Sequence, residues 1–239
     1  MVEKEQALIA RVLDLFAQRF AKRAVLRGGM VLRILGSSRF TNDLDYVFVP
    51  YKSKKDIVPE VVECLERIEG AKIRHSLNSK CTRVVLTVDG ATIQIEAKVA
   101  MTARTSMAST RAFSREFNLP PRMVCIAEHS VALANKLAAW NERRLIRDIY
   151  DIWFFLQMGI MPDKETLESR LKKPEYSRLV NKKDRFPGFT AGEFYDFIRR
   201  QVANMTDDEI GESMADYLPP DETGGLAMQF RAALVKLRS

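Results

Sequence analysis

The segment Leu26–Val49, LRGGMVLRILGSSRFTNDLDYVFV, decides the fold of this chain. Two glycines follow an apolar run, a short apolar stretch comes next, and two aspartates then stand two positions apart among β-branched and aromatic residues. Carboxylates inside a strand are unfavourable unless something positive lies between them. The pattern therefore predicts a strand, a glycine turn, a short helix, a polar loop and a second strand that carries a functional site.

The two aspartates of this segment are Asp43 and Asp45, which alternate with Leu44 and Tyr46. In a strand, both carboxylates therefore point to the same face. Two carboxylates this close repel each other unless a cation bridges them. Oxygen ligands of this kind suit Mg²⁺ or Mn²⁺. The alternative is an edge strand with two solvated acids, and the spacing alone does not choose between the two.

The surroundings of the aspartates favour function. Gly28 and Gly29 stand where a strand turns into a helix, an arrangement whose backbone N–H groups bind phosphate, although a tight turn would use the same glycines. A third acid, Glu96, interrupts the apolar run TIQIEAKV and either faces water or lies beside the first two. If its strand is adjacent to theirs, Asp43, Asp45 and Glu96 form a metal triad for phosphoryl transfer.

The hydrophobic periodicity predicts an α+β protein. Up to residue 100 the expected order is α-β-α-β-α-β-β-β, a small mixed sheet with helices packed on it. The last two strands of this region, 81–88 and 91–99, are joined by Asp89-Gly90, a strong hairpin signal. The rest is expected to be helical after the break at Pro120-Pro121, which places the domains at 1–115 and 116–239. Its helices are predicted near 126–140, 144–157, 163–172, 190–203, 206–217 and 225–238.

Composition limits the partners and the compartment. The chain of 239 residues carries a net charge of +7, with basic residues concentrated in 98–122 and 164–185, which favours a polyanionic partner such as RNA. Tyr176 and Phe186 stand among the cations of the second segment, and both segments could receive an RNA backbone. No apolar run reaches the ~18 residues of a transmembrane helix, and three cysteines without CxxC spacing suit a reducing cytoplasm.

Two motifs in matching order resemble a known family. LRGGMVLRIL…RFTNDLDYVF is similar to the hG[G/S]…DxD signature of the DNA polymerase β-like nucleotidyltransferases, and more closely to the KGGTAL…RFSxDLDF pattern of the AbiEii/AbiGii-type toxins. The second motif, NKLAAWNERRLIRDIYDIWFFL, resembles the helical EKLxAL…R…RDxYDL of those toxins. The resemblance spans roughly residues 24–157. It implies an N-terminal polymerase β-like nucleotidyltransferase domain with a small mixed sheet, and a mainly α-helical C-terminal domain that completes the active site.

The resemblance also implies roles for the residues of the first motif. Gly28 and Gly29 would hold the triphosphate, and Asp43 and Asp45 would hold Mg²⁺. Thr41 stands where the family often has serine, and its hydroxyl would lie beside the phosphates. A separate match places Glu96, in IQIEAK, on an IxxEI-like strand of the family.

In the second motif the matching residues are Lys136, Arg143, Arg147, Asp148 and Asp151. The resemblance implies that Lys136 approaches the nucleotide phosphates and that Asp148 and Asp151 complete the polar centre, with the two arginines in substrate-binding positions.

Helical spacing provides an independent interpretation of the second motif. Arg144, Asp148 and Asp151 fall at i, i+4 and i+7 on one helix face, and Arg147 is four positions before Asp151, within pairing distance. A salt-bridged, solvated helix face would have the same spacing.

The expected function is that of a Mg²⁺-dependent, NTP-dependent nucleotidyltransferase, the toxin of a toxin–antitoxin (abortive infection) pair. It would transfer NMP to an RNA acceptor such as the 3′ end of tRNA, in the cytoplasm, without a membrane, and with a cognate antitoxin as partner. The alternatives are a nucleotidyltransferase that modifies a small molecule or a protein, and a catalytically inactive protein that keeps the fold to bind RNA or a partner.

Overall fold

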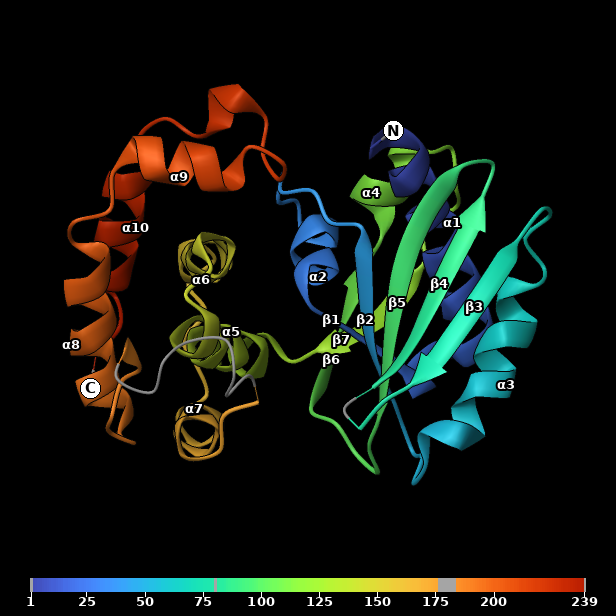
Figure 1. Cartoon of the computed structure of the whole chain (residues 1–239), viewed down its shortest axis with the longest axis horizontal. Helices are drawn as coiled ribbons and strands as arrows, with labels where there is room; N and C mark the ends of the chain where they lie inside the picture. Colours follow the sequence, from blue (N-terminus) through green and yellow to red (C-terminus); the bar gives the residue numbers. More distant parts are fainter. Residues whose placement is uncertain (1, 80, 176–183, 239) are drawn as a thin grey trace. The chain divides into compact units, whose positions relative to one another are not determined.

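The structure is a computed structural model that describes residues 2–79, 81–175 and 184–238 (Figure 1). Tyr176 of the second basic segment lies outside these residues. The chain divides into two compact units, Met1–Glu128 and His129–Ser239. The expected division of labour between an N-terminal catalytic domain and a helical domain that completes its site stays a prediction.

The N-terminal unit is built on a seven-stranded mixed sheet with the order β3-β4-β5-β2-β1-β7-β6. The strand pairs β2–β5 and β1–β7 are parallel, and the other neighbours are antiparallel. The strands are β1 (Ala24–Arg27), β2 (Asp43–Phe48), β3 (Lys72–Leu77), β4 (Thr82–Val88), β5 (Ala91–Val99), β6 (Thr105–Ser109) and β7 (Met123–Ala127). The predicted mixed sheet with helices on it is thus confirmed for its first five strands.

Two helices, α1 (Val2–Phe20) and α3 (Lys54–Leu65), cover the same face of this sheet (Figure 1). The rings of Phe16 and Phe20 on α1 pack against Phe48 of β2, with centroid separations of 6.2 and 5.1 Å. The short helices α2 (Gly29–Ile34) and α4 (Arg111–Glu116) contact each other, and α2 also packs on β1 and β2. The main core of the unit therefore lies between the sheet and the pair α1 and α3.

The last two strands of the sheet differ from the prediction. Residues 123–127 were expected to lie in the helical part of the chain, and a helix was expected to begin at Ile126, but β7 occupies this segment and α5 begins at His129. Val124–Ala127 are all buried, and β7 runs parallel to β1. A strand that is buried on both faces shows a continuous apolar run, which periodicity does not distinguish from a buried helix.

The C-terminal unit is helical, as predicted. Its helices include α5 (His129–Arg143), α6 (Ile146–Gln157), α7 (Lys164–Lys172), α8 (Ala191–Val202), α9 (Asp207–Met214) and α10 (Leu226–Leu234). Ile149, Ile152 and Leu156 of α6 are buried in the core of this unit. The backbone of Arg144 has a φ of +55°, which breaks the helical path between α5 and α6. Arg144 thus lies outside α6, contrary to the helix predicted from residue 144.

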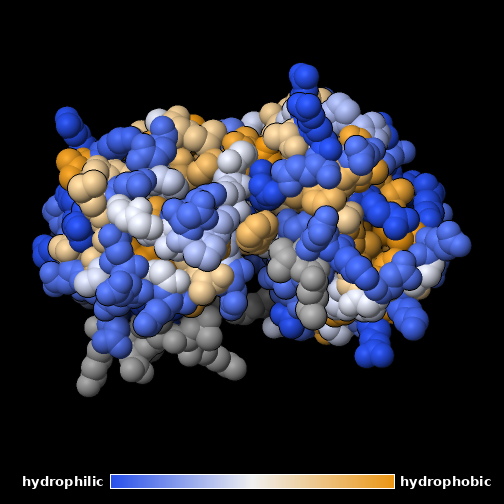
Figure 2. Space-filling model, turned by 90° about the horizontal axis from the view of Figure 1, so that it is seen from above, coloured by the Kyte–Doolittle hydropathy of each residue, from blue (hydrophilic) through white to orange (hydrophobic). Residues whose placement is uncertain are grey.

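The surface is mainly hydrophilic on the face drawn in Figure 2, where hydrophobic residues stand in small separate groups. Within the described ranges, none of the helices has the length and apolar character needed to cross a membrane.

Cys64, Cys81 and Cys125 are free and buried, in keeping with the reducing environment expected from the sequence.

Candidate active site

The three acids expected to form a site lie on one face of the sheet. Leu44 and Tyr46 of β2 are buried on the helix-covered face, so Asp43 and Asp45 point to the opposite face, which neither α1 nor α3 covers (the open face), and both are half-buried there. Strand β5 runs parallel beside β2, and its Glu96 is the register partner of Asp45. The adjacency on which the triad hypothesis depended is therefore present.

The glycine turn fits closely against one of these acids. Gly28 has a φ of +72°, a conformation that favours glycine. A Cβ atom at Gly28 would lie 2.0 Å from Oδ2 of Asp45, so no other residue fits without displacing the carboxylate. The pairing of β1 with β2 brings the two together, because Arg27, next to Gly28, is the register partner of Asp45.

The second glycine of the turn fits against a cation that the sequence analysis did not assign. A Cβ at Gly29 would lie 2.3 Å from Nη2 of Arg39 and 3.4 Å from Oγ1 of Thr41. Arg39 is buried, with 5% of its surface exposed. Gln6 of α1 donates a hydrogen bond of 2.6 Å to the backbone oxygen of Thr41 and so anchors the loop. The sequence signal that could have identified Arg39 is its position in RFTNDLD, two residues before Thr41.

Glu96 is held by an ion pair on the open face. Nη2 of Arg83, its cross-strand partner on β4, donates to Oε1 of Glu96 at 2.9 Å, and Nε2 of Gln94 donates to the same oxygen at 3.3 Å. The hydrogen bond and the charge of Glu96 raise the pKa of the Arg83 guanidinium. Glu96 therefore already has a cationic partner in this structure.

The donor set decides which metal these residues suit. Within residues 2–79, 81–175 and 184–238, no three acids, histidines or cysteines come together in a group that could hold a metal ion. Asp43 and Asp45 form a two-carboxylate set, and Mg²⁺ binds through one or two carboxylates together with waters and substrate phosphates. The pair thus fits Mg²⁺, whereas Glu96 would have to separate from Arg83 to become a third ligand.

The acids of the second motif form a buried ionic cluster within the C-terminal unit. Asp148 and Asp151 of α6 are fully buried. Nζ of Lys136, on α5, forms an ion pair with Asp151 and lies 3.7 Å from Oδ1 of Asp148. Arg143 donates two hydrogen bonds to Asp148, of 2.7 and 2.6 Å. Four of the five residues predicted from this motif are therefore in direct contact, and Lys136 keeps 15% of its side chain exposed.

Arg147 and Arg144 do not occupy the positions expected from helical spacing. Nη1 of Arg147 donates to the hydroxyl of Tyr217 at 2.7 Å, so the predicted Arg147–Asp151 pair is wrong. Arg144 does not share a helix face with the two aspartates. Its guanidinium lies over the rings of Trp140 and Phe197, 4.2 and 4.9 Å from their centroids. Burial lowers the pKa of Arg144 to about 10. The position of Arg144 differs because α5 ends at Arg143 and α6 begins at Ile146, so Arg144 lies in neither helix.

The two basic segments predicted as RNA contacts are partly engaged in internal pairs. Arg122 pairs with Asp14 at 2.6 Å, and Arg104 pairs with Glu128 at 2.8 Å. In the second segment, Phe186 packs against other rings, with a centroid 5.5 Å from that of Phe194. Phe186 therefore belongs to an aromatic cluster of the unit, and the segment 176–183 lies outside the described residues.

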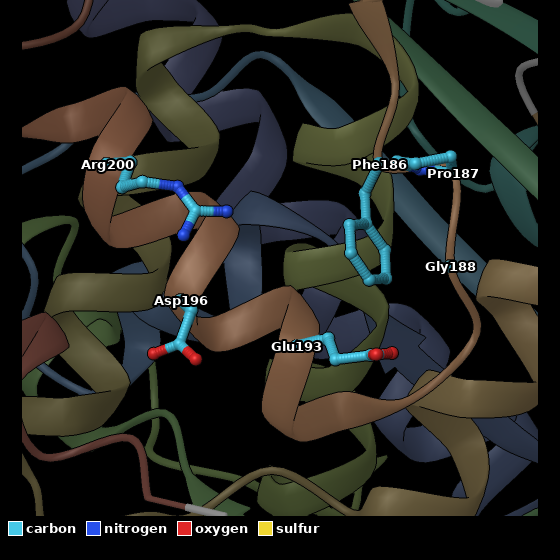
Figure 3. A pocket seen from close by; sticks show the side chains of 6 residues that line it. All are labelled: Phe186, Pro187, Gly188, Glu193, Asp196 and Arg200. Atoms are coloured by element: carbon cyan, nitrogen blue, oxygen red, sulfur yellow. The ribbon is translucent and has the colours of Figure 1, made fainter.

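A cavity of about 350 Å³ lies in the C-terminal unit, beside α8 (Figure 3). Glu193, Asp196 and Arg200 project from α8 towards it, and Phe186 lies across from them (Figure 3). None of the residues predicted for the active site lines this cavity.

Comparisons with known proteins agree with the family that the two sequence motifs resemble. A family model described as "Nucleotidyl transferase AbiEii toxin, Type IV TA system" matches residues 11–234. JHP933 from Helicobacter pylori has a similar structure, with a TM-score of 0.58 and 14% identity over 97% of this chain and 91% of that chain. MenT4, a nucleotidyltransferase toxin from Mycobacterium tuberculosis, superposes with a TM-score of 0.54 and 16% identity over 100% and 94%. No curated protein matches the sequence.

At these identities the structural likeness shows a shared fold, and the family model identifies the family. It covers nearly the whole chain, including both motifs and the sheet that positions Asp43 and Asp45. The chain belongs to the AbiEii family of nucleotidyltransferase toxins of type IV toxin–antitoxin systems.

Proposed function

We propose that this nucleotidyltransferase transfers a nucleoside monophosphate from an NTP to an RNA acceptor such as the 3′ end of tRNA, in a Mg²⁺-dependent reaction. The family implies an NTP substrate and a cognate antitoxin. In the proposed reaction a hydroxyl oxygen of the acceptor attacks the α-phosphorus of the NTP. The bond to the α-phosphate forms, the bond to the bridging oxygen breaks, pyrophosphate leaves, and the hydroxyl proton passes to a base or to water.

The observation that carries the proposal is the contact of Gly28 with Asp45. A Cβ at Gly28 would meet the Asp45 carboxylate at 2.0 Å, so the turn and the acid occupy one compact site on the open face of the sheet. Gly29 likewise lies against the guanidinium of Arg39 and near the hydroxyl of Thr41. A triphosphate at this turn would have backbone N–H groups, a cation and a hydroxyl on one side and the two acids on the other.

Asp43 and Asp45 are the proposed Mg²⁺ ligands because they are two carboxylates on one face of one strand. When bound, the cation would neutralise charge on the triphosphate and on the pyrophosphate that leaves. Glu96 is the proposed third acid, either as a ligand or as the base that receives the hydroxyl proton. In either role it would first separate from Arg83.

For the charged residues of the C-terminal unit we propose a role in catalysis, and a purely structural role is the alternative. Lys136 would neutralise phosphate charge as a point cation, with Asp148, Asp151, Arg143 and Arg147 in supporting positions. The structure of this unit equally accounts for Lys136 as the counter-ion of the buried carboxylate of Asp151.

The proposal is tested by incubating the purified protein with total tRNA, Mg²⁺ and each α-³²P-labelled NTP in turn. We expect label on RNA from the native protein and none from the variant Asp45→Asn. Asp89→Asn is the matched control, since it makes the same chemical change in the β4–β5 hairpin, where Asn-Gly is a favoured turn. Equal labelling by Asp45→Asn and Asp89→Asn would refute the assignment of the site.

The distribution of label separates the other candidate acceptors. Label on protein or on a small molecule, lost in Asp45→Asn, would keep the site and replace the acceptor. Absence of label and of released pyrophosphate in every reaction, with correctly folded protein, would favour a protein that only binds RNA or a partner.

A further inference from the structure

The open face of the sheet extends beyond the candidate site to the outer strands β4 and β3. The order β3-β4-β5-β2 places these strands next to the pair that carries Asp45 and Glu96. Register pairing forms a continuous row across the four strands, from Ser76 through Arg83 and Glu96 to Asp45. Neighbouring strands are about 4.8 Å apart, so this row extends the site outward by roughly 10 to 15 Å.

The side chains on this face of the outer strands include cations and hydroxyls, with Val85 between them. On β4 the residues that alternate with the buried positions point to the open face, since α1 and α3 cover the other face (Figure 1), and their register partners on β3 and β5 share the open face. The cations and hydroxyls on this face include Lys72, Arg74 and Ser76 of β3, Arg83 and Thr87 of β4, and Thr92 of β5. The hydroxyls of Thr87 on β4 and Thr92 on β5 lie 3.0 Å apart, which confirms that these two strands present the two residues on the same face.

Two of these cations, Lys72 and Arg74, differ from Arg83, which is paired with Glu96. Lys72 and Arg74 are exposed, and among the residues that the structure describes neither forms an ion pair. This differs from Arg104 and Arg122 of the basic segment predicted from the sequence, which are paired with carboxylates. Unpaired, exposed cations are free to displace counterions from a polyanion, which is the main source of affinity for nucleic-acid backbones.

From these observations we infer that the open face of β3 and β4 binds the phosphate backbone of the RNA acceptor, with Lys72 and Arg74 in contact with phosphates and the 3′ end directed towards Asp45. This inference rests on the proposed function. A face of cations and hydroxyls is complementary to the phosphates of an RNA backbone. This face leads to the carboxylates of the candidate site, where the terminal hydroxyl of the RNA would react. None of the six side chains is aromatic, so contact is with the backbone and is tolerant of base sequence.

The test compares two double variants that remove the same charge. Lys72→Gln/Arg74→Gln changes the proposed surface. Lys55→Gln/Arg67→Gln is the matched control, because it also removes one exposed lysine and one exposed arginine, which lie in and just after α3 on the opposite face of the sheet. Binding of total tRNA and of a labelled single-stranded RNA of about 12 nucleotides is measured by fluorescence anisotropy over a range of salt concentrations.

For Lys72→Gln/Arg74→Gln we expect a rise in Kd of roughly 10- to 30-fold near 0.1 M salt, and a loss of about 1.4 in the slope of log K against log salt. The KM for RNA in the transfer reaction should rise with it, while the KM for NTP stays unchanged. The control should bind as the native protein does. Equal affinities of the two double variants, or a loss confined to the control, would overturn the inference.

Failure of this inference is distinguishable from failure of the proposed function. Native protein that labels RNA while Lys72→Gln/Arg74→Gln binds and labels it equally well refutes only the surface. Native protein that labels a protein acceptor and binds no RNA refutes both. Native protein that binds RNA without labelling any acceptor refutes the transfer reaction, and the two double variants still decide the surface.

Discussion

Asp45 lies so close to Gly28 that its carboxylate leaves no room for a side chain at this position of the turn. A Cβ at Gly28 would stand 2.0 Å from Oδ2 of Asp45, and the φ of +72° at Gly28 is itself unfavourable for other residues. The pairing of β1 with β2 sets this contact, because the strand that ends at Arg27 lies antiparallel to the strand that carries the acid. The glycine turn and the candidate metal ligand therefore form one structural unit.

Gly28→Ala is expected to abolish NMP transfer and to lower stability. The added Cβ displaces the Asp45 carboxylate, and the positive φ adds about 1–3 kcal/mol of strain. Activity and the free energy of unfolding in urea are measured side by side. Gly36→Ala is the control, since Gly36 has a φ of +101° with no atom within 4 Å of its Cβ position. If both variants lose activity equally, displacement of Asp45 is not the cause.

Arg39→Met is expected to raise the KM for NTP at least tenfold, because the guanidinium of Arg39 lies against Gly29 in the proposed phosphate turn. Arg39→Lys should recover part of the affinity by restoring the charge without the planar group. Arg33→Met serves as control, since Arg33 pairs with Glu116 outside the turn. A KM for NTP that does not change in Arg39→Met would remove Arg39 from the site.

Glu96→Gln separates a role in metal binding from a role in holding Arg83. The amide keeps a hydrogen-bond acceptor for Arg83 and loses the charge of the carboxylate. As a ligand or base, Glu96 is needed as an anion, so the variant should require more Mg²⁺ or lose transfer rate. The Mg²⁺ dependence of the rate is measured for this variant and for Arg83→Met, which releases Glu96 from its partner. Native behaviour of Glu96→Gln would leave Glu96 with only a structural role.

Lys136→Met is expected to destabilise the C-terminal unit by about 3–5 kcal/mol, because it leaves the buried Asp151 without its cation. The free energy of unfolding is measured in urea. The double variant Lys136→Met/Asp151→Leu should recover much of the stability, since it removes the buried charge as well. If it recovers stability but not transfer, the Lys136–Asp151 pair acts in the reaction in addition to its structural role. Recovery of both would make the role of Lys136 structural alone.

The three cysteines are expected to resist alkylation in the folded protein. All are buried and therefore inaccessible to reagents, and desolvation also raises the pKa of the Cys64 thiol, which disfavours the thiolate of Cys64. Titration with a thiol reagent should modify them only as urea unfolds the chain, with a midpoint equal to that of the spectroscopic transition. Rapid modification in native buffer would contradict this packing.

Much of the fold follows from local sequence. The first five strands, the short helix α2 and the helices of the C-terminal unit were predictable because most have a period of two or of 3.6 residues, and glycine or proline marks many of their boundaries. Strand β7 was not, since its uninterrupted apolar run is shared by buried strands and buried helices, and only its parallel partner β1 distinguishes them.

For the site, the sequence by itself determined that Asp43 and Asp45 share a face and that a glycine turn precedes them, because strand alternation and glycine conformation are local properties. Only the tertiary structure decided that Glu96 stands beside Asp45, that Arg83 holds it and that Arg39 lies against Gly29. It also paired Lys136 with Asp151, and it placed Arg144 between aromatic rings and Arg147 on Tyr217. These contacts join residues from different elements, and their geometry depends on strand order, register and the end of α5, none of which a local pattern encodes.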